Sequence, residues 1–309
     1  MAEIVISEFM DEAAVERLCV AYNCFYDPNL VDRPEELSTL VADARALIVR
    51  NRTQVRPDLL AAASNLVCVG RLGVGLDNID VVACQERDVD VFPATGANDL
   101  SVAEYVITTT QVLLRGAYLS NHQMIRGEWP RQALIGRELS EKTMGLIGFG
   151  SIAREVAVRA EALGMTVIAY DPMLEDNNPA WAMAKRVSLD DLASSADVVS
   201  LHVPLTDQTH HLAGADFLKN MKSDAVLINA ARGGVVDEES LAQVLASGDI
   251  AGAALDVFEV EPLTEDAGAK FAGIDNLILT PHIAGVTEES NVRVSHLIAD
   301  KVLERLESI

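Results

Sequence analysis

Residues 144–153 read Met-Gly-Leu-Ile-Gly-Phe-Gly-Ser-Ile-Ala, an apolar strand that runs directly into a glycine turn and a helix. Gly148, Gly150 and Ala153 give the spacing Gly-x-Gly-x-x-Ala, one form of the dinucleotide-binding fingerprint. Gly148 permits the tight turn, Gly150 lets backbone amides approach a pyrophosphate, and Ala153 keeps the helix close to the strand. The first N–H groups of that helix favour phosphate. The stretch therefore predicts a dinucleotide site.

The acidic residue that such a site needs comes at the expected distance. The next predicted strand, 166–170, ends at Asp171, 23 residues after Gly148. A carboxylate there accepts hydrogen bonds from the adenosine ribose hydroxyls. Met173 and Leu174 follow it, and neither can bind a 2′-phosphate, so the sequence favours NAD over NADP. The alternative is an ordinary strand–turn–helix with a surface aspartate.

Length and composition indicate a two-domain protein of the cytoplasm. The chain has 309 residues, half of them apolar, but no apolar run of membrane-spanning length and no secretory leader. Its four cysteines lack metal-binding spacing, which is typical of reduced thiols. Twenty-four Lys and Arg against 47 Asp and Glu give a net charge of −23. Nucleic acid is therefore not an expected partner, and the acidic surface suggests solubility at high salt.

Alternating strands and helices predict two doubly wound parallel sheets, the α/β class. The first set has strands at 3–7, 24–26, 46–49, 66–69 and 89–92. A helix at 101–114, capped by Asp99, leads to a polar, irregular stretch at 121–142. Six strands follow, near 144–148, 166–170, 198–202, 225–229, 251–255 and 277–280. We expect a Rossmann NAD-binding domain over 98–283. A helix at 287–307 returns to the first set, making a discontinuous, flavodoxin-like substrate domain of 1–97 and 284–309.

Three strands of the second set end in residues suited to a 2-hydroxy acid. Arg232 follows one, Glu259 and Glu261 follow another, and His282 follows a third. Ligands bind outside the carboxyl ends of such strands. An arginine holds the substrate carboxylate, a histidine moves the proton, and a nearby carboxylate orients the histidine. Either glutamate could serve as that carboxylate.

These motifs, with Tyr170-Asp-Pro, His202-Val-Pro-Leu-Thr and the run from Asn229 to Asp237, resemble the D-isomer-specific 2-hydroxyacid dehydrogenases over essentially the whole chain. The resemblance implies an NAD-dependent enzyme without a metal, in which Arg232 binds substrate, Glu261 is the partner of the histidine, and His282 is the acid/base. One departure is Ala153, where relatives usually have glycine. The implied cofactor-binding residues are Gly148, Gly150, Ser151, Ile152, Asp171, His202, Pro204, Thr206, Ala230, Asp256 and Gly285.

The first domain offers a candidate site for a second, distal anion on the substrate. Arg50, Arg52 and Arg71 lie at two neighbouring strand ends, although solvated surface arginines are the ordinary interpretation. Two arginines flanking one residue resemble the phosphate-binding loop of the 3-phosphoglycerate dehydrogenase branch, while length and motifs resemble the short (S)-sulfolactate dehydrogenase branch. Sulfolactate oxidation is the first expectation and D-3-phosphoglycerate oxidation the alternative. The expected substrate-binding residues are Arg50, Asn51, Arg52, Arg71, Val74, Gly75 and Arg131.

The resemblance also implies a homodimer built around the dinucleotide domains. The helix at 101–114 and the 121–142 segment are the expected contact, with Trp129 as an anchor and Arg131 reaching the neighbouring subunit's substrate. A hypothesis of another class is an NAD(H)-sensing regulatory protein. The set of Arg232, Glu261 and His282 argues against it, because a sensor needs no proton donor.

Overall fold

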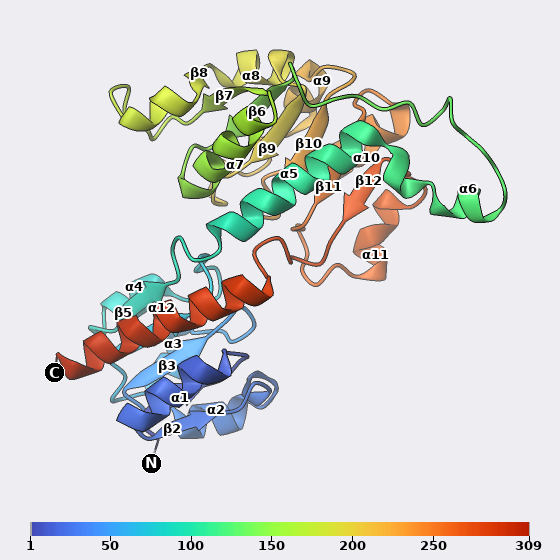
Figure 1. The fold of residues 1–309 in the computed structure, drawn as a ribbon. Helices are drawn as coiled ribbons and strands as arrows, with labels where there is room; N and C mark the ends of the chain where they lie inside the picture. The colour runs from blue at the N-terminus through green and yellow to red at the C-terminus, as the bar shows by residue number, and fades with distance from the viewer. Residues whose placement is uncertain (1, 309) are drawn as a thin grey trace. The chain divides into compact units, whose positions relative to one another are not determined.

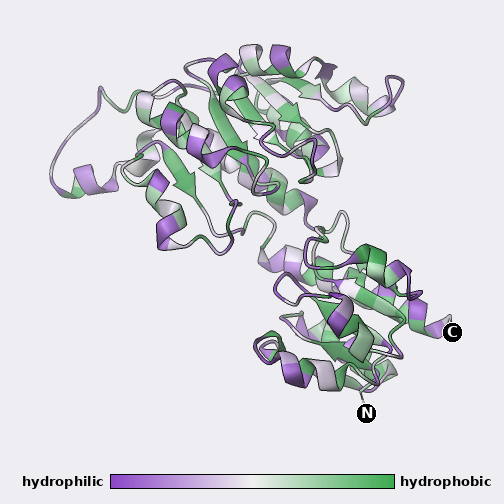
Figure 2. Cartoon of the chain, turned by 180° about the vertical axis from the view of Figure 1, so that it is seen from behind, coloured by the Kyte–Doolittle hydropathy of each residue, from purple (hydrophilic) through white to green (hydrophobic). Residues whose placement is uncertain are grey.

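The computed structural model describes residues 2–308, which fall into two compact units (Figure 1). Unit 1 comprises Met1–Asn98 and Val286–Ile309, and unit 2 comprises Asp99–Gly285. Each unit has one parallel sheet with helices on both faces. In both sheets the strands are apolar and the outer faces of the helices are polar (Figure 2). The predicted α/β class with two doubly wound parallel sheets is confirmed.

Unit 1 contains a five-stranded sheet in the order β2-β1-β3-β4-β5, the flavodoxin-like order. Its strands are β1 (Ile4–Ile6), β2 (Cys24–Tyr26), β3 (Ala46–Val49), β4 (Cys68–Arg71) and β5 (Asp90–Pro93). The helices are α1 (Glu12–Ala21), η1 (Leu30–Asp32), α2 (Pro34–Leu40), α3 (Pro57–Ala62), α4 (Val81–Gln85) and α12 (Glu288–Glu307).

Both faces of this sheet are buried, which explains why its strands are continuous apolar runs. Successive side chains of a strand point to opposite faces. Ile4 and Ile6 accordingly join one core cluster, and Val5 joins the other. Helix α12 packs against β4 and α1, so the last helix lies on the sheet built by the first hundred residues. Gly70 in β4 permits this contact, because a Cβ there would lie 2.5 Å from Ile298 Cγ2.

Unit 2 contains a seven-stranded sheet in the order β12-β11-β10-β9-β6-β7-β8. The strands are β6 (Thr143–Ile147), β7 (Thr166–Tyr170), β8 (Lys185–Arg186), β9 (Val198–Leu201), β10 (Val226–Asn229), β11 (Gly252–Leu255) and β12 (Leu277–Leu279). The sheet grows in one direction from β6 and in the other from β9. These neighbours therefore form the switch point, where open α/β sheets bind ligands.

Helices cover both faces of this sheet. They are α5 (Asp99–Arg115), η2 (Ala117–Leu119), α6 (Asn121–Ile125), α7 (Ser151–Ala162), η3 (Pro179–Met183), α8 (Leu189–Ser195), α9 (Ala215–Asn220), α10 (Glu238–Ser247), α11 (Glu265–Gly268) and η4 (Ala269–Phe271). Helix α5 packs on α7 and β10, while the segment carrying α6 projects from the rest of unit 2 (Figure 1). Within residues 2–308 no helix has the length and apolar character needed to cross a membrane.

Several local predictions were wrong. The second sheet has seven strands, not six, because β8 has only two residues, both charged and exposed, and so gives no apolar signal. Asp99 is the first residue of α5 rather than its cap. Residues 121–125 of the supposedly irregular stretch form α6. Strand β4 begins at Cys68, two residues later than expected, because Leu66 and Val67 precede the pairing with β3.

Candidate active site

The glycine turn after β6 has the geometry that a dinucleotide needs. Gly148 has φ +86°, and a Cβ there would lie 2.5 Å from the carbonyl oxygen of His202. At Gly150, the N-cap of α7, no atom beyond its chain neighbours lies within 4 Å of the Cβ position. Ser151 is exposed and Ile152 is half-buried at the start of the helix. The turn thus requires one glycine for conformation and leaves open space at the other, as a pyrophosphate on the helix N-terminus would require.

Asp171 ties this turn to the end of β7. Its Oδ2 accepts from the Phe149 amide at 2.8 Å, and its Oδ1 accepts from the amides of Met173 at 2.9 Å and Leu174 at 3.2 Å. A carboxylate has about four acceptor positions. One position therefore remains for a ribose hydroxyl.

The loop after β9 contributes three of the expected cofactor residues. His202 Nε2 lies 2.9 Å from Ser200 Oγ, and burial lowers the pKa of His202 to about 4. Its ring is therefore neutral near pH 7 and is not suited to proton exchange there. Pro204 and Thr206 are exposed beyond it, and the Thr206 amide donates to Thr209 Oγ1 at 2.8 Å.

Asn229 shapes the turn that presents Arg232. The Asn229 side chain is buried, its Nδ2 donates to the Arg232 carbonyl at 2.9 Å, and its Oδ1 accepts from the Ala231 amide at 3.1 Å. Ala230 is half-buried between them. Sequence reasoning gave Asn229 no role, although an asparagine that bonds to nearby backbone is a common turn former.

His282 and Glu261 form a hydrogen-bonded pair. His282 Nδ1 lies 2.8 Å from Glu261 Oε2, and the Phe258 amide donates to Glu261 Oε1 at 3.0 Å. Burial acts to raise the pKa of Glu261, but these hydrogen bonds and the charges of His282 and Arg232 lower it below its usual value. An ionised carboxylate only accepts, so Nδ1 carries a hydrogen and Nε2 is the nitrogen left for proton transfer. Arg232 is thus close enough to Glu261 for its charge to lower the pKa of that carboxyl.

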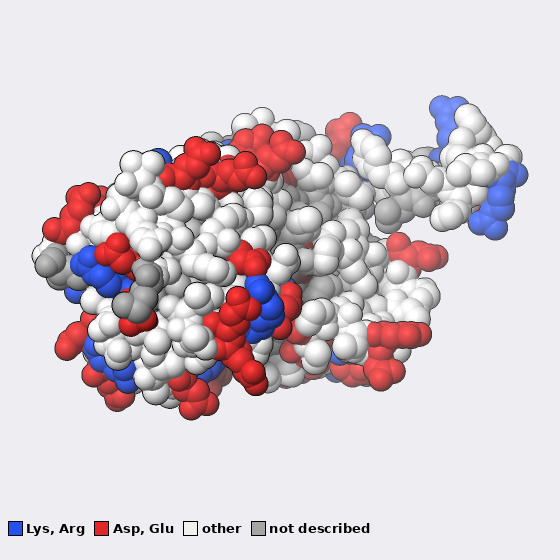
Figure 3. Space-filling model, turned by 90° about the horizontal axis from the view of Figure 1, so that it is seen from below, with Lys and Arg blue, Asp and Glu red and all other residues white. Residues whose placement is uncertain are grey.

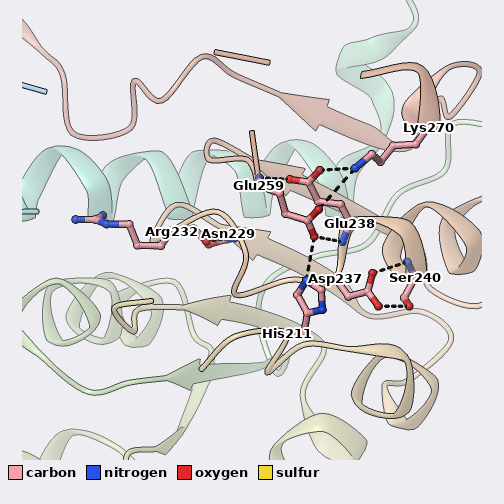
Figure 4. Close-up of polar contacts among 8 residues, drawn as sticks. All are labelled: His211, Asn229, Arg232, Asp237, Glu238, Ser240, Glu259 and Lys270. Carbon is pink, nitrogen blue, oxygen red and sulfur yellow. Dashed lines mark hydrogen bonds and ion pairs between the residues drawn. The ribbon is translucent and has the colours of Figure 1, made fainter. Parts of the chain in front are cut away.

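Glu259, the other candidate partner, is bound elsewhere (Figure 4). Its Oε1 accepts from His211 Nε2 at 3.1 Å and from the Glu238 amide at 3.2 Å. Its own amide donates to Glu238 Oε1 at 2.7 Å, and Lys270 Nζ donates to Glu238 Oε2 at 2.9 Å. The Arg232 side chain extends away from this cluster. The cluster therefore anchors the turn that carries Glu261, a role that the sequence did not indicate.

Asp256 holds the turn around His282. Its side chain is buried, Oδ1 accepts from the Ile283 amide at 2.8 Å, and Oδ2 accepts from the Ala284 amide at 2.8 Å. Gly285, the last expected cofactor residue, is half-buried directly after these two. Among residues 2–308 no group of three or more His, Cys, Asp or Glu side chains could hold a metal ion.

In unit 1 a buried carboxylate organises the loop that carries two of the expected substrate arginines. Glu8 follows β1 and accepts from the amides of Arg50 at 2.8 Å, Asn51 at 3.4 Å, Arg52 at 3.1 Å and Thr53 at 3.0 Å. Burial acts to raise the pKa of Glu8, but the amides of Thr53, Arg50 and Arg52 lower it below its usual value. Sequence reasoning did not find Glu8.

Each of the three arginines contacts a different part of unit 1. Arg50 Nη2 donates to Asn291 Oδ1 at 2.7 Å, and its guanidinium lies 5.8 Å from the ring centroid of Phe9. Arg52 is exposed and forms an ion pair with Asp32. Arg71 folds over Gly73, where a Cβ would lie 1.5 Å from Arg71 Nη1. Any anion that Arg52 binds must therefore compete with Asp32.

The remaining expected substrate residues lie in loops. Val74 and Gly75 are half-buried in the loop after β4. Arg131 is exposed in the segment that follows α6, and its amide donates to the Trp129 carbonyl at 2.8 Å. Nearby apolar side chains are also exposed, with Ile125 at 83%, Trp129 at 77% and Ile135 at 72%.

A Rossmann-type sheet with an open glycine turn and a histidine–carboxylate pair defines a nicotinamide-dependent dehydrogenase. The sequence profile described as "D-isomer specific 2-hydroxyacid dehydrogenase, NAD binding domain" matches residues 107–284. An (S)-sulfolactate dehydrogenase of Chromohalobacter salexigens is 53% identical over 99% of each chain. The chain therefore belongs to the D-isomer-specific 2-hydroxyacid dehydrogenase family, and it is an NAD-dependent oxidoreductase.

Other relatives differ in the substrates that their names give. A hydroxypyruvate reductase of Thermotoga maritima is 40% identical over 88% of each chain. A D-3-phosphoglycerate dehydrogenase of Archaeoglobus fulgidus is 39% identical over 87% of this chain and 51% of its own. The crystal structure of a D-lactate dehydrogenase from Aquifex aeolicus complexed with NAD and lactic acid superposes with a TM-score of 0.83, at 26% identity, over 99% of this chain and 98% of that one.

The Glu8 hydrogen bonds predict a pH-dependent stability difference. Replacing Glu8 with Gln should lower the free energy of unfolding by about 1.5–3 kcal/mol at pH 7, because charge-assisted bonds to several amides are lost. The folded-state pKa of Glu8 is lowered, so its contribution is complete above the unfolded-state pKa and is lost as the pH falls through the folded-state value. Urea titrations at pH 7 and at stepwise lower pH measure the difference.

The control for this measurement is Glu16→Gln, which removes an exposed carboxylate from the adjoining helix α1. It should change the urea midpoint little at either pH. A Glu8→Gln difference that stays constant into acid would show that the effect is steric and independent of the carboxylate charge.

Proposed function

We propose that the protein oxidises (S)-3-sulfolactate to 3-sulfopyruvate with NAD. The 53% identity to a sulfolactate dehydrogenase over nearly the full length of both chains carries the substrate assignment. The contact between His282 and Glu261, with the charge of Arg232 close by, supports the reaction class. The same site would also catalyse the reverse reaction, the reduction of 3-sulfopyruvate.

The proposed roles follow from the chemistry of each group. Arg232 binds the C1 carboxylate of the substrate, because a guanidinium matches a carboxylate with two parallel hydrogen bonds. His282 accepts the hydroxyl proton at Nε2 during oxidation, and Glu261 stabilises the ring as it becomes charged. NAD, when bound, would supply the acceptor for the hydride of C2. The residues that would hold NAD are the Gly148–Ile152 turn, Asp171, and the loops at Pro204, Ala230 and Asp256.

We further propose that Arg50, Arg52 and Arg71 of unit 1 bind the distal sulfonate, with Asn51, Val74 and Gly75 completing the substrate contacts. Support comes from the Glu8 hydrogen bonds, which hold the backbone of the Arg50–Thr53 loop in one conformation. A loop fixed through its amides can present its side chains to a ligand with little loss of conformational freedom.

The alternative substrate in the same class is D-3-phosphoglycerate, which several relatives of 35–39% identity are named for. A sulfonate carries one negative charge and a phosphate ester nearly two, and both suit an arginine site. A regulatory NAD(H) sensor is less well supported, since it would not need the His282–Glu261 pair. A panel of sulfolactate, 3-phosphoglycerate, D-glycerate and D-lactate, followed by NADH absorbance, separates these alternatives.

The first prediction concerns the acid/base. His282→Asn should reduce kcat by roughly 10²–10⁴-fold and leave the affinity for NADH nearly unchanged, because the ring moves a proton but binds no phosphate. Steady-state kinetics and NADH fluorescence titration measure the two quantities. His296→Asn, at the surface of unit 1, is the control and should retain full activity. Near-normal turnover by His282→Asn would remove this residue from the mechanism.

The second prediction concerns the distal anion. Arg52→Met should lower kcat/KM for sulfolactate by about one to two powers of ten, mainly through KM, and change D-lactate oxidation little. Inorganic sulfate should inhibit the wild type competitively and the variant less. Arg33→Met is a matched control, because Arg33 is also exposed and ion-paired, with Asp27 and Glu36. Equal losses for both substrates would assign Arg52 a structural role.

The third prediction concerns assembly. We propose a cytoplasmic homodimer in which α5 and the projecting segment make the contact, because Ile125, Trp129 and Ile135 are all more than two-thirds exposed in one chain. Sedimentation velocity at micromolar concentration should give a dimer for the wild type and a monomer for Trp129→Glu. A fully active wild-type monomer would contradict the proposal.

A further inference from the structure

His282 has an unusual backbone conformation that its surroundings must maintain. Its φ is +52°, in the left-handed region that residues other than glycine seldom adopt. The His282 amide donates to the Asp256 carbonyl at 2.8 Å, and the two following amides donate to the Asp256 carboxylate. The position of this ring therefore depends on how firmly the Asp256 side chain is held.

The Asp256 carboxylate is held in turn by a chain of hydroxyl groups. Thr280 Oγ1 donates to Asp256 Oδ1 at 2.6 Å, and the Tyr105 hydroxyl lies 2.6 Å from the same Thr280 oxygen. Thr280 has one hydroxyl hydrogen, which it gives to the carboxylate. Tyr105 must therefore be the donor to Thr280.

Tyr105 is suited to that role. It lies on α5, 175 residues from Thr280 in the sequence, and its ring is half-buried. Burial and the charge of Asp256 raise the pKa of Tyr105 to about 12. The phenol thus keeps its hydrogen near pH 7. Each hydroxyl group then donates in one defined direction, Tyr105 to Thr280 and Thr280 to Asp256.

We propose that Tyr105 and Thr280 are positioning residues that fix the catalytic turn at His282 through the Asp256 carboxylate. The inference rests on the proposed acid/base role of His282. Neither hydroxyl needs to touch substrate or cofactor. Without the Tyr105 hydroxyl, Thr280 is free to rotate, Asp256 loses its fixed donor, and the turn at His282 loosens. Proton transfer depends steeply on such placement, since a displacement of about 1 Å can cost a hundredfold in rate.

The test compares four variants by hydrogen exchange and by kinetics. Tyr105→Phe and Thr280→Val remove one hydroxyl each, whereas Thr280→Ser keeps the hydroxyl. Tyr26→Phe is the matched control, because the Tyr26 hydroxyl donates to the Met10 carbonyl in unit 1. Exchange of the Ile283 and Ala284 amides is read by mass spectrometry. Turnover is measured with the 2-hydroxy acid that the wild type oxidises fastest, so an incorrect substrate assignment does not affect the result.

Tyr105→Phe and Thr280→Val should speed exchange at Ile283 and Ala284 roughly fivefold to tenfold, about the effect of one hydrogen bond. They should lower kcat about tenfold, with KM and NADH affinity within about twofold of wild type. Thr280→Ser should restore both exchange and kcat, and Tyr26→Phe should change neither.

Wild-type exchange in Tyr105→Phe and Thr280→Val would overturn the inference, and so would faster exchange with unchanged kcat. A loss of kcat in Tyr26→Phe as large as in Tyr105→Phe would overturn it too, because general destabilisation would then explain both. Failure of the proposed function gives a different result, namely normal turnover by His282→Asn. The exchange measurement needs no substrate and still decides whether the hydroxyl chain holds the turn.

Discussion

The candidate active site depends on carboxylates that accept hydrogen bonds from backbone amides. A loop at the carboxyl end of a strand has amides without sheet partners, and leaving them unpaired away from water costs free energy. Asp256 satisfies the amides after His282, Asp171 satisfies those of Phe149 and two later residues, and Glu8 satisfies the Arg50–Thr53 loop. Each is a carboxylate one or two residues beyond the end of a strand. The loops that bear functional groups therefore have defined conformations in the protein alone.

This arrangement assigns distinct roles to the acidic residues of a chain with net charge −23. Most of them cover the surface, where acidic groups predominate over basic ones on the face shown in Figure 3. Salt largely screens interactions between exposed charges that are more than about a Debye length apart, whereas the interactions of buried groups are screened much less. The carboxylates of Glu8 and Asp256 are buried, so the loops that they hold should tolerate changes of ionic strength that alter the surface.

Hydrogen-bond partners also explain why two glutamates in one turn have different roles. Glu259 and Glu261 lie in one turn, but the Glu259 carboxylate contacts His211 and the Glu238 amide, the latter at the start of α10, while Glu261 contacts His282. The first contact fixes the turn on the body of unit 2, with Lys270 as a counter-charge, and leaves the second carboxylate free to face the histidine. Gly233 brings the Arg232 turn against the same segment, since a Cβ there would lie 1.7 Å from the Phe258 carbonyl oxygen.

The sequence alone determined the features that depend on residues close to one another along the chain. The glycine turn at Gly148, the alternation of buried strands and helices, and the strand ends that carry Arg232 and His282 follow from local conformational preferences and periodicity. Strand β8 was not predicted, because its two residues are charged and exposed and so form no apolar pattern. The residue pattern left open which glutamate meets His282; the family resemblance implied Glu261, and the structure puts that residue in contact with the histidine. Only the tertiary structure decided that Glu8 holds a loop more than forty residues away and that Tyr105 reaches Thr280 across 175 residues. Such contacts arise from the packing of distant elements, so no local pattern in the chain specifies them.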